Sequence, residues 1–387
     1  MSALPIPPKE SRKYSQQLCD LVQLNIKQQG GWISFSDFMH MALYTPEMGY
    51  YTGGFQKIAD TQSGGGDFVT APEISPLFAQ ALASQLAEML TLTGGDVLEL
   101  GAGTGTLAAG ILQGLAKLDC LPAHYFILEV SDHLRTVQLE TLQAMLPEAM
   151  LARVVWLDAL PLGHSGVIVG NELLDALPVH LLTKKAGQIV ERGVQFDGQF
   201  AWHDQPLHDQ HLLDLIDAHA WPEGYLSEVC PAAVGLMRSL AGLLKHGFIL
   251  MIDYGFGAAE YYHPQRNQGT LMCHYQHYAH SDPLTYIGLQ DITAHVNFTA
   301  IAEAATDEGL VLEGYTNQAQ FLMNCGLLDM LKRQAEDQTV DYSRFAAGVQ
   351  KLLSPAEMGD LFKVIAFSQG VEEALSGFAN GDKSHTL

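Results

Sequence analysis

The pattern that most constrains this fold is a repeated alternation of short apolar segments with amphipathic ones, which begins near residue 95. Four apolar segments are bounded by residues that favour turns: 96–100, 124–130, 153–157 and 166–170. Residues 106–118 and 133–145, between them, carry apolar side chains at helical spacing. Buried strands that alternate with helices are typical of a parallel sheet covered on both faces. We therefore predict a doubly wound α/β domain.

Other segments flank this domain. Helices are predicted over 14–31, ending at Gly30-Gly31, and near 34–44. An antiparallel hairpin is predicted at about 188–203, because apolar and polar residues alternate on both sides of the turn signal Asp197-Gly198. The strand pattern resumes in the sequence HGFILMIDYG, and the late apolar run LFKVIAF is interpreted as a closing strand.

The charge balance narrows the classes of partner. The 387 residues include 20 Lys and Arg and 43 Asp and Glu, which gives a net charge of −23. This excess of acids repels phosphate backbones, and basic residues never run beyond adjacent pairs such as Lys184-Lys185. A cationic partner is therefore expected and nucleic acid is not. The five cysteines lack C-x-x-C spacing and are interpreted as reduced thiols.

Hydropathy suggests no membrane partner. No apolar stretch approaches the roughly 20 residues needed to cross a bilayer. The first residues show neither a signal peptide nor a transit peptide pattern, so a cytoplasmic location is expected.

The loop after the first predicted strand, VLELGAGTGTLA, indicates a nucleotide site. Gly101, Gly103 and Gly105 allow a ligand to approach the backbone where a helix amino terminus offers free N–H groups. Dinucleotides and S-adenosylmethionine both fit such a loop. Glu99 favours the second, because a carboxylate near a pyrophosphate costs about 1–4 kcal/mol, whereas S-adenosylmethionine carries an ammonium and a sulfonium. An ordinary strand-to-helix turn remains the alternative.

Acids follow the next predicted strands. Glu129 stands where an acid accepts hydrogen bonds from ribose hydroxyls, and Asp158 is a candidate acceptor for the adenine amino group. A surface acid at a strand end is the alternative for each.

A third group of polar residues, Asn171, Glu172 and Asp175, follows the fourth predicted strand. If a helical turn starts here, Glu172 and Asp175 share a face and form a fork for a planar guanidinium, with one carboxylate acting as base. Helix capping beside a solvated acid is the alternative interpretation of these residues.

Seven stretches resemble the MidA-like family of class I methyltransferases, whose mitochondrial members methylate an arginine on a complex I subunit. The matching stretches are GYY (49–51), GDFVTAPEIS (66–75), LELGAGTGTLA, ILEVSDHLRTVQ, NELLDALPVH, MIDYGF and DITAHVNF (291–298). They lie in the expected order over about 250 residues. Residues 185–245 and 330–350 carry little that is recognisable.

The resemblance implies a role for each matched position. Gly101, Ala102 and Gly103 would lie along the methionine part of S-adenosylmethionine, with Gly105 completing the loop. Glu129, with its neighbour Val130, would contact the ribose and Asp158 the adenine, while Asn171 and Glu172 would lie beside the transferred methyl. Thr70 and Glu73 belong to a loop that would close over the cofactor. These contacts, and catalysis by Glu172, Asp175 and Asn171, are the predicted site.

The family's fold adds a helical cap to a seven-stranded sheet whose last strand is antiparallel, and the late run from Leu361 suits that strand. We divide the chain accordingly. The four expected segments are a helical cap with the closing loop (1–75), a Rossmann-like core that binds S-adenosylmethionine (76–185), an inserted hairpin with helices (186–245), and the rest of the sheet with C-terminal helices and a substrate flap (246–387).

Three functions remain open at this stage. The first is methylation of an arginine on a partner protein, the second is methylation of a small molecule, and the third is a non-catalytic assembly factor that binds S-adenosylmethionine. A homodimer is the expected oligomer. The histidine-rich stretch 263–280 lacks acids and has no spacing typical of a metal site, so no metal is predicted and the stretch is interpreted as a polar flap near the substrate.

Overall fold

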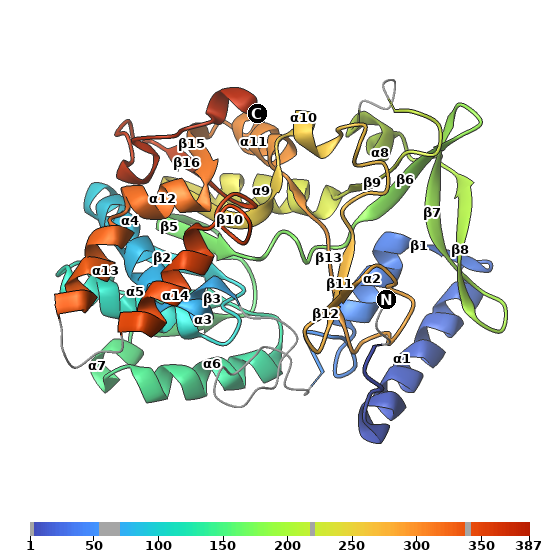
Figure 1. Cartoon of the computed structure of the whole chain (residues 1–387), viewed down its shortest axis with the longest axis horizontal. Coiled ribbons are helices and arrows are strands. Elements are labelled where there is room, and N and C mark those ends of the chain that lie inside the picture. The colour runs from blue at the N-terminus through green and yellow to red at the C-terminus, as the bar shows by residue number, and fades with distance from the viewer. Residues whose placement is uncertain (1–3, 54–69, 217–220, 337–341) are drawn as a thin grey trace. The chain divides into compact units, whose positions relative to one another are not determined.

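The chain folds into two compact units, each built from three separate stretches (Figure 1). A computed structural model describes residues 4–53, 70–216, 221–336 and 342–387. We call residues 69–173, 236–257 and 296–387 the sheet unit, and residues 1–68, 174–235 and 258–295 the hairpin unit. Helix α9 (Pro231–Leu243) contains one boundary between them.

The sheet unit is a mixed α/β structure around one eight-stranded sheet. Seven strands run in the order β15-β16-β10-β5-β2-β3-β4, and the short β14 pairs with β10. Their bounds are β2 Asp96–Leu100, β3 Tyr125–Leu128, β4 Val154–Leu157, β5 His164–Asn171, β10 Leu244–Phe256, β14 Val296–Asn297, β15 Val311–Asn317 and β16 Phe362–Gln369. Each strand predicted for this sheet forms within a few residues of its expected position.

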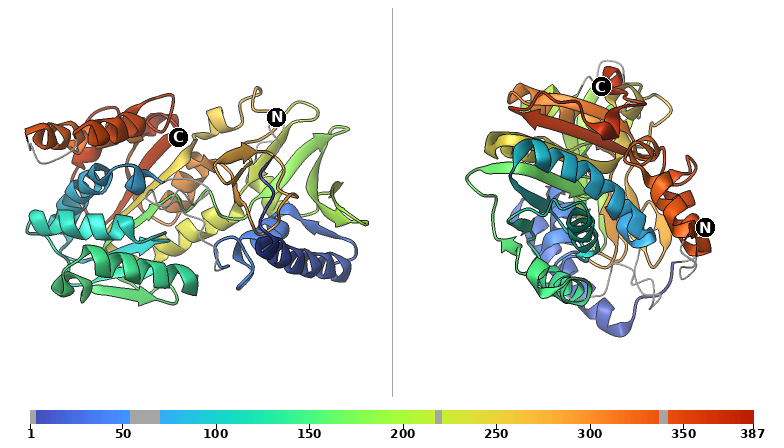
Figure 2. Two further views of the ribbon diagram at one scale, coloured as in Figure 1. Left: turned by 60° about the horizontal axis from the view of Figure 1, so that its bottom comes forward. Right: turned by 90° about the vertical axis from the view of Figure 1, so that its left-hand side faces the viewer.

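Strand direction in this sheet follows the expected pattern. Strands β4, β3, β2, β5 and β10 run parallel to one another. The late run forms β16, which is antiparallel to both β10 and β15. Figure 2 shows the C-terminal part of the chain, in orange and red, from two further sides. A doubly wound arrangement, with helices on both faces, stays a prediction.

The helices of this unit connect the strands. They are α3 Ala71–Ile74, α4 Pro76–Thr93, α5 Thr106–Lys117, α6 Asp132–Met145, α7 Glu148–Leu151, α11 Phe298–Asp307, α12 Gln318–Asn324, α13 Leu327–Glu336 and α14 Tyr342–Leu353, with short 3-10 turns at Ser376–Phe378 and Ser384–Thr386. The buried faces of α4, α5 and α12 pack into a large apolar core with one face of the sheet. Gly110 and Gly114 bring α5 unusually close to α4: a Cβ at either would lie 2.4 Å from the Cβ of Ala79 or Ala83.

The described residues of the hairpin unit form two small antiparallel sheets. One has the order β1-β7-β6-β9 with β8 on β7, and the other the order β12-β11-β13. The strands are β1 Trp32–Ser34, β6 His180–Lys185, β7 Gln188–Phe196, β8 Phe200–Pro206, β9 Leu226–Val229, β11 Met272–Tyr275, β12 Tyr278–His280 and β13 Asp291–Thr293. The helices are α1 Lys9–Gln28, α2 Phe35–Tyr44, α8 Gln210–Asp214 and α10 Ala258–Tyr261.

Several sequence-based expectations for this unit are confirmed. The predicted hairpin is β7 and β8, joined at Asp197-Gly198. Both N-terminal helices form, and the Ser34 side chain caps α2 by accepting from the amide of Asp37. The pairing of β1 with β7 joins residues far apart in sequence and was not expected. Side chains of α1, α2 and the strands form an apolar core in this unit.

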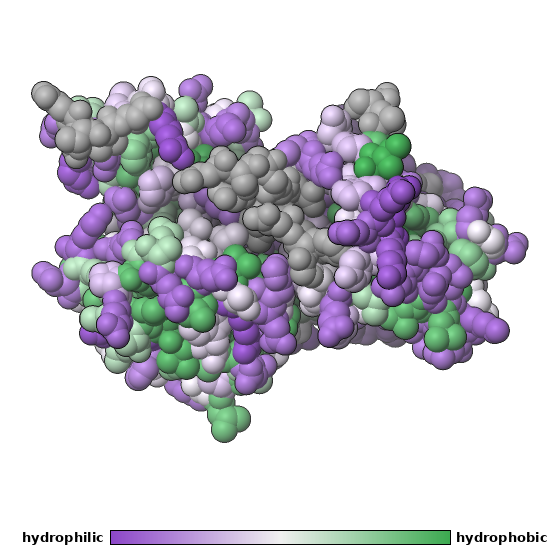
Figure 3. Space-filling model, turned by 90° about the horizontal axis from the view of Figure 1, so that it is seen from below, coloured by the Kyte–Doolittle hydropathy of each residue, from purple (hydrophilic) through white to green (hydrophobic). Residues whose placement is uncertain are grey.

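The surface is largely hydrophilic on the face drawn in Figure 3, where hydrophobic side chains lie scattered among polar ones. Within the described ranges, no helix is long and apolar enough to span a membrane. The same ranges hold no group of three or more metal-ligating side chains that could bind an ion. All five cysteines are free thiols.

Candidate functional site at the carboxyl edge of the sheet

Strand register places four of the predicted site positions in one row. Leu100, the last residue of β2, pairs with Leu128 of β3 and Gly170 of β5. Leu128 in turn pairs with Leu157 of β4. The residues that follow these positions are Gly101, Glu129, Asp158 and Asn171. The carboxyl edge of a parallel sheet is where such folds bind ligands, and the sheet brings these four residues to that edge.

The glycine loop has the backbone that its sequence predicts. Gly101, Gly103 and Gly105 have φ values of 66°, 54° and 85°, a region that other residues rarely adopt. Gly105 caps the amino terminus of α5. A Cβ at Gly101 would lie 3.0 Å from Leu173 Cδ1, so the loop also lies against the chain that follows β5. The loop can therefore present bare backbone to a ligand.

Glu99 lies behind this loop, buried on β2. Its carboxylate accepts a hydrogen bond from the Tyr125 hydroxyl at 2.8 Å. Burial raises the pKa of Glu99 to about 7; the bond from Tyr125 opposes this rise and the nearby Glu129 adds to it. Near neutral pH its charge is therefore sensitive to a neighbouring ligand, and a cation stabilises the ionised form.

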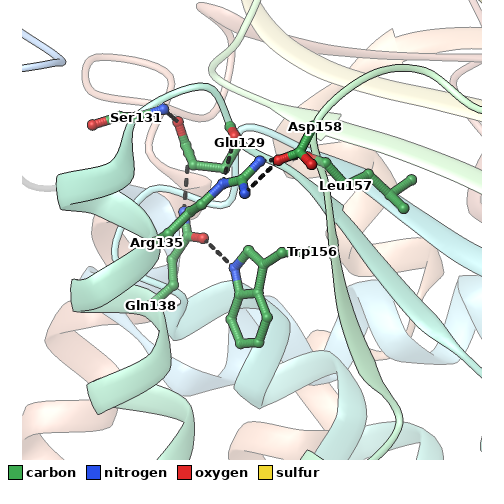
Figure 4. Close-up of polar contacts among 7 residues, drawn as sticks. All are labelled: Glu129, Ser131, Arg135, Gln138, Trp156, Leu157 and Asp158. Carbon is green, nitrogen blue, oxygen red and sulfur yellow. Dashed lines mark hydrogen bonds and ion pairs between the residues drawn. The ribbon is translucent and has the colours of Figure 1, made fainter.

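Glu129 lies at the end of β3 within a buried polar network (Figure 4). One carboxylate oxygen accepts from the Ser131 amide at 2.9 Å and the other from Gln138 Nε2 at 3.0 Å. Burial raises the pKa of Glu129, while the bonds from Ser131 and Gln138 lower it. Gln138, missed in the sequence, occupies a core-facing position of α6 one turn before Leu142, and a polar residue on an apolar helix stripe is the signal that could have found it.

Arg135 holds the ends of β3 and β4 together. Its Nε donates to the Glu129 carbonyl at 2.9 Å, and its NH1 contacts the Asp158 carboxylate at 2.7 Å (Figure 4). The side chain of Asp158 is 92% exposed, so this pair contributes little to stability. Val130, the other residue predicted here, is 72% exposed.

Of Thr70 and Glu73, both predicted from the closing loop, Glu73 contacts the glycine loop. Glu73 forms a capping box with Thr70 at the start of α3, where the Thr70 amide donates to Glu73 Oε2 at 3.2 Å. The other carboxylate oxygen accepts from Thr104 Oγ1 at 3.2 Å. The preceding part of that loop, residues 66–69, lies outside the described residues.

Asn171 is the last residue of β5, and Glu172, which follows it, has an unusual backbone conformation. Glu172 has a φ of 50°, which is costly for a residue with a side chain. Its Oε1 accepts from Asn171 Nδ2 at 3.1 Å and from the Ala71 amide at 3.3 Å. The buried Asp253 secures the turn by accepting from the Leu173 amide at 3.0 Å, a role that the sequence did not reveal.

Asn171 also has an orphaned acceptor. Its Oδ1 is buried and, within the described part of the chain, has no hydrogen-bond partner. A buried acceptor without a donor costs about 1–3 kcal/mol. A ligand that donates hydrogen bonds or carries positive charge would remove this cost.

The helical turn on which a Glu172–Asp175 fork depended does not form. Residues 172–178 form no helix and contain only bends and one short turn, because the positive φ of Glu172 interrupts a right-handed helix. Glu172 belongs to the sheet unit, and the buried Asp175 belongs to the hairpin unit. Joint action of the two acids stays a prediction.

The polar groups at this edge favour a nucleotide that carries positive charge and hydroxyl groups. Carboxylates and the Asn171 oxygen supply acceptors along the row, and Arg135, a cation at this edge, already pairs with Asp158. A pyrophosphate, which only accepts hydrogen bonds, would meet acceptors here. An ammonium, a sulfonium and ribose hydroxyls fit the residues that are present.

Comparisons with known proteins agree with this chemistry. Residues 81–316 match a family described as "Putative S-adenosyl-L-methionine-dependent methyltransferase". The mitochondrial protein arginine methyltransferase NDUFAF7 of Rattus norvegicus is 28% identical, covering 93% of this chain and 86% of that protein. The NDUFAF7 homolog of Caenorhabditis elegans, which bears the same description, is 26% identical over 84% of this chain and 79% of its own.

Two crystal structures from Burkholderia thailandensis are similar over their whole length. One, bound to S-adenosyl-homocysteine, has 50% sequence identity, a TM-score of 0.96 and full coverage of both chains. The other, a native structure, has 49% identity and a TM-score of 0.92, again with full coverage.

Proposed function

Because this chain belongs to the MidA-like family of S-adenosylmethionine-dependent methyltransferases, we propose that it transfers a methyl group to an arginine side chain of a partner protein. The expected cofactor, S-adenosylmethionine, is confirmed by the family match and by the similar structure that holds S-adenosyl-homocysteine. The arginine acceptor and the protein partner are the proposed part. The named activity of the NDUFAF7 relatives supports them.

The residues at the carboxyl edge would hold the cofactor along its length. Glu129 would accept from the ribose hydroxyls, and Asp158, held by Arg135, would face the adenine. The glycine loop would follow the methionine part, with Glu99 supplying negative charge behind it and Asn171 an acceptor. When bound, S-adenosylmethionine supplies a methyl group on a sulfonium, an excellent leaving group.

The chain's own contribution to transfer is mainly positioning. Aligning a nucleophile with the methyl in a water-poor site can lower the barrier by about 7–11 kcal/mol. A protonated guanidinium is a poor nucleophile, so Glu172 would orient it and accept its proton. Its strained backbone and its bond from Ala71 fix the carboxylate beside Asn171.

A single observation carries the proposal: an acid follows β5 directly, next to the glycine loop, in a backbone conformation that has an energetic cost. Conformations of this kind cluster at functional sites. A carboxylate there suits a guanidinium acceptor better than it suits a neutral one.

Mass spectrometry can test the acceptor. Lysate from cells that lack the protein is incubated with isotope-labelled S-adenosylmethionine and either the wild type or Glu172→Gln. We expect label on an arginine-containing peptide with the wild type only. Label confined to the small-molecule fraction would establish small-molecule methylation instead. No label, together with intact binding of S-adenosyl-homocysteine, would indicate an assembly factor.

A further inference from the structure

One fully buried side chain, Gln138 on α6, links three parts of the carboxyl edge. Its Nε2 donates to Glu129 Oε2 at 3.0 Å and to the Gly103 carbonyl at 3.1 Å. Its Oε1 accepts from Trp156 Nε1 at 2.9 Å. A single amide thus joins the end of β3, the glycine loop and β4. Figure 4 shows its contacts with Glu129 and Trp156.

Trp156 determines which way this amide points. The indole N–H can only donate, so the amide oxygen of Gln138 must face it. Both amide hydrogens are then directed to the other side, where Glu129 and the Gly103 carbonyl accept them. Every contact of the group is satisfied in one orientation, so a reversed amide would lose all three bonds.

The same contacts influence the proton on Glu129. Burial raises the pKa of this carboxyl group, and the donors at Ser131 and Gln138 lower it. Two further charged groups act on it: Arg135 lowers its pKa, and Glu99 interacts with it as a second acid. Without Gln138, Glu129 would keep its proton to higher pH. A protonated carboxyl group has less capacity to accept from a ribose diol.

We propose that Gln138 is a positioning residue for the cofactor's nucleoside: it fixes the Glu129 carboxylate relative to the Gly103 carbonyl before any ligand binds. The inference rests on the proposed role of Glu129 in holding the ribose. It concerns cofactor binding alone, so it stands or falls separately from the identity of the methyl acceptor.

Calorimetric titration with S-adenosyl-homocysteine at pH 6 and pH 8 tests this inference. Gln138→Met keeps the length of the side chain and removes its three hydrogen bonds. Gln113→Met is the matched control, because Gln113 donates to the Met145 carbonyl, outside this network. Trp156→Phe removes only the bond that orients the amide and serves as the second variant if Gln138→Met does not fold. Gln138→Met is also made in a Glu129→Gln background.

We expect Gln138→Met to bind about ten- to a hundred-fold more weakly than the wild type at pH 8, the usual effect of losing a bond to a buried charge. This loss of affinity relative to the wild type should be larger at pH 6. In the Glu129→Gln background it should shrink to a few fold, because the two residues are coupled. Trp156→Phe should show the same pH trend at smaller size, and Gln113→Met none.

Three results would overturn the inference. Affinity equal to that of the wild type would mean that Gln138 positions nothing. An equal loss at both pH values would indicate a merely structural role. An unchanged loss in the Glu129→Gln background would show that Gln138 does not act through Glu129. Because Glu99 titrates in every variant, only differences from the wild type are compared. A failure to find methylated arginine leaves all of these measurements intact.

Discussion

The ends of β3 and β5 lie in the same row of the sheet, yet their polar groups are organised in opposite ways. At the end of β3, Glu129 and Gln138 satisfy one another and their neighbours within the protein. At the end of β5, no described residue donates to the Asn171 oxygen, and Glu172 has a left-handed backbone. The comparison suggests that the nucleoside end is formed in advance, whereas the reacting end is completed by its ligands.

The largest effect is expected from Gly103→Val, because it alters the glycine loop, which lies next to the ends of both strands. A β-branched residue at a φ of 54° is strained, and its side chain would fill the space where the loop exposes backbone. We expect binding of S-adenosyl-homocysteine to be lost in calorimetry and turnover to be lost with it. Retained binding would contradict the assignment of the loop.

A smaller but more selective effect is expected from Glu172→Gln. If the end of β5 acts on the acceptor, turnover should fall by about 10²–10⁴-fold, the usual contribution of a general base. Affinity for S-adenosyl-homocysteine should stay within a few fold. Glu129→Gln is the matched control and should show the reverse pattern, with the main loss in affinity. Lost binding in Glu172→Gln would move this residue to the cofactor.

Asn171→Ala tests whether the polar groups at the end of β5 depend on a ligand to complete their hydrogen bonds. Removing an orphaned oxygen should offset the lost bond to Glu172, so we expect the free energy of unfolding to change by less than about 1 kcal/mol. The gain in Tm on adding S-adenosyl-homocysteine should shrink. In Asn324→Ala, the comparison variant, the lost side chain donates to the carbonyls of Gly377 and Asn380, so stability should fall by more. Equal losses of stability in the two variants would contradict the contrast between the ends of β3 and β5.

The smallest effect concerns Glu99 and pH. Because its pKa rises from 4.5 to about 7 on folding, the folded state holds a proton that the unfolded state has released between these values. Stability due to this group is therefore present at low pH and declines as pH rises through 7. Glu99→Gln should be more stable than the wild type at pH 8 by about 1–3 kcal/mol and similar at pH 5. Denaturant unfolding at both values measures this, and a pH-independent difference would refute it.

The sequence predicted the parts of the molecule that local pattern encodes. Strands such as β2 and β16 are mostly apolar, and the Asp197-Gly198 pair is a turn signal that identifies its hairpin from local sequence. The pairing of Trp32 with Gln195 could not be foreseen, because such a contact depends on the folded chain and not on neighbours in sequence. The edge positions Gly101, Glu129 and Asn171 followed from the rule for parallel sheets.

The supporting residues of the site were harder to find. Gln138 and Asp253 act by holding other groups, and nothing in their spacing points to a ligand. The predicted fork of Glu172 and Asp175 required a helical turn. The sequence did not predict the positive φ of Glu172, because glutamate seldom adopts such a conformation. The sequence predicted that Glu172 follows a strand, and the structure agrees, but its role stays a prediction.

The close packing of α5 on α4 has a practical consequence for engineering. Gly110 and Gly114 place only the α4 methyl groups of Ala79 and Ala83 between the two helices. These helices begin next to the glycine loop and next to Glu73. A library that randomises the loop to accept a different methyl donor should therefore hold both glycines constant. Any larger residue at either position would push the two helices apart and move the binding groups at their ends. A variant that failed for this reason would be mistaken for one whose new loop cannot bind the donor.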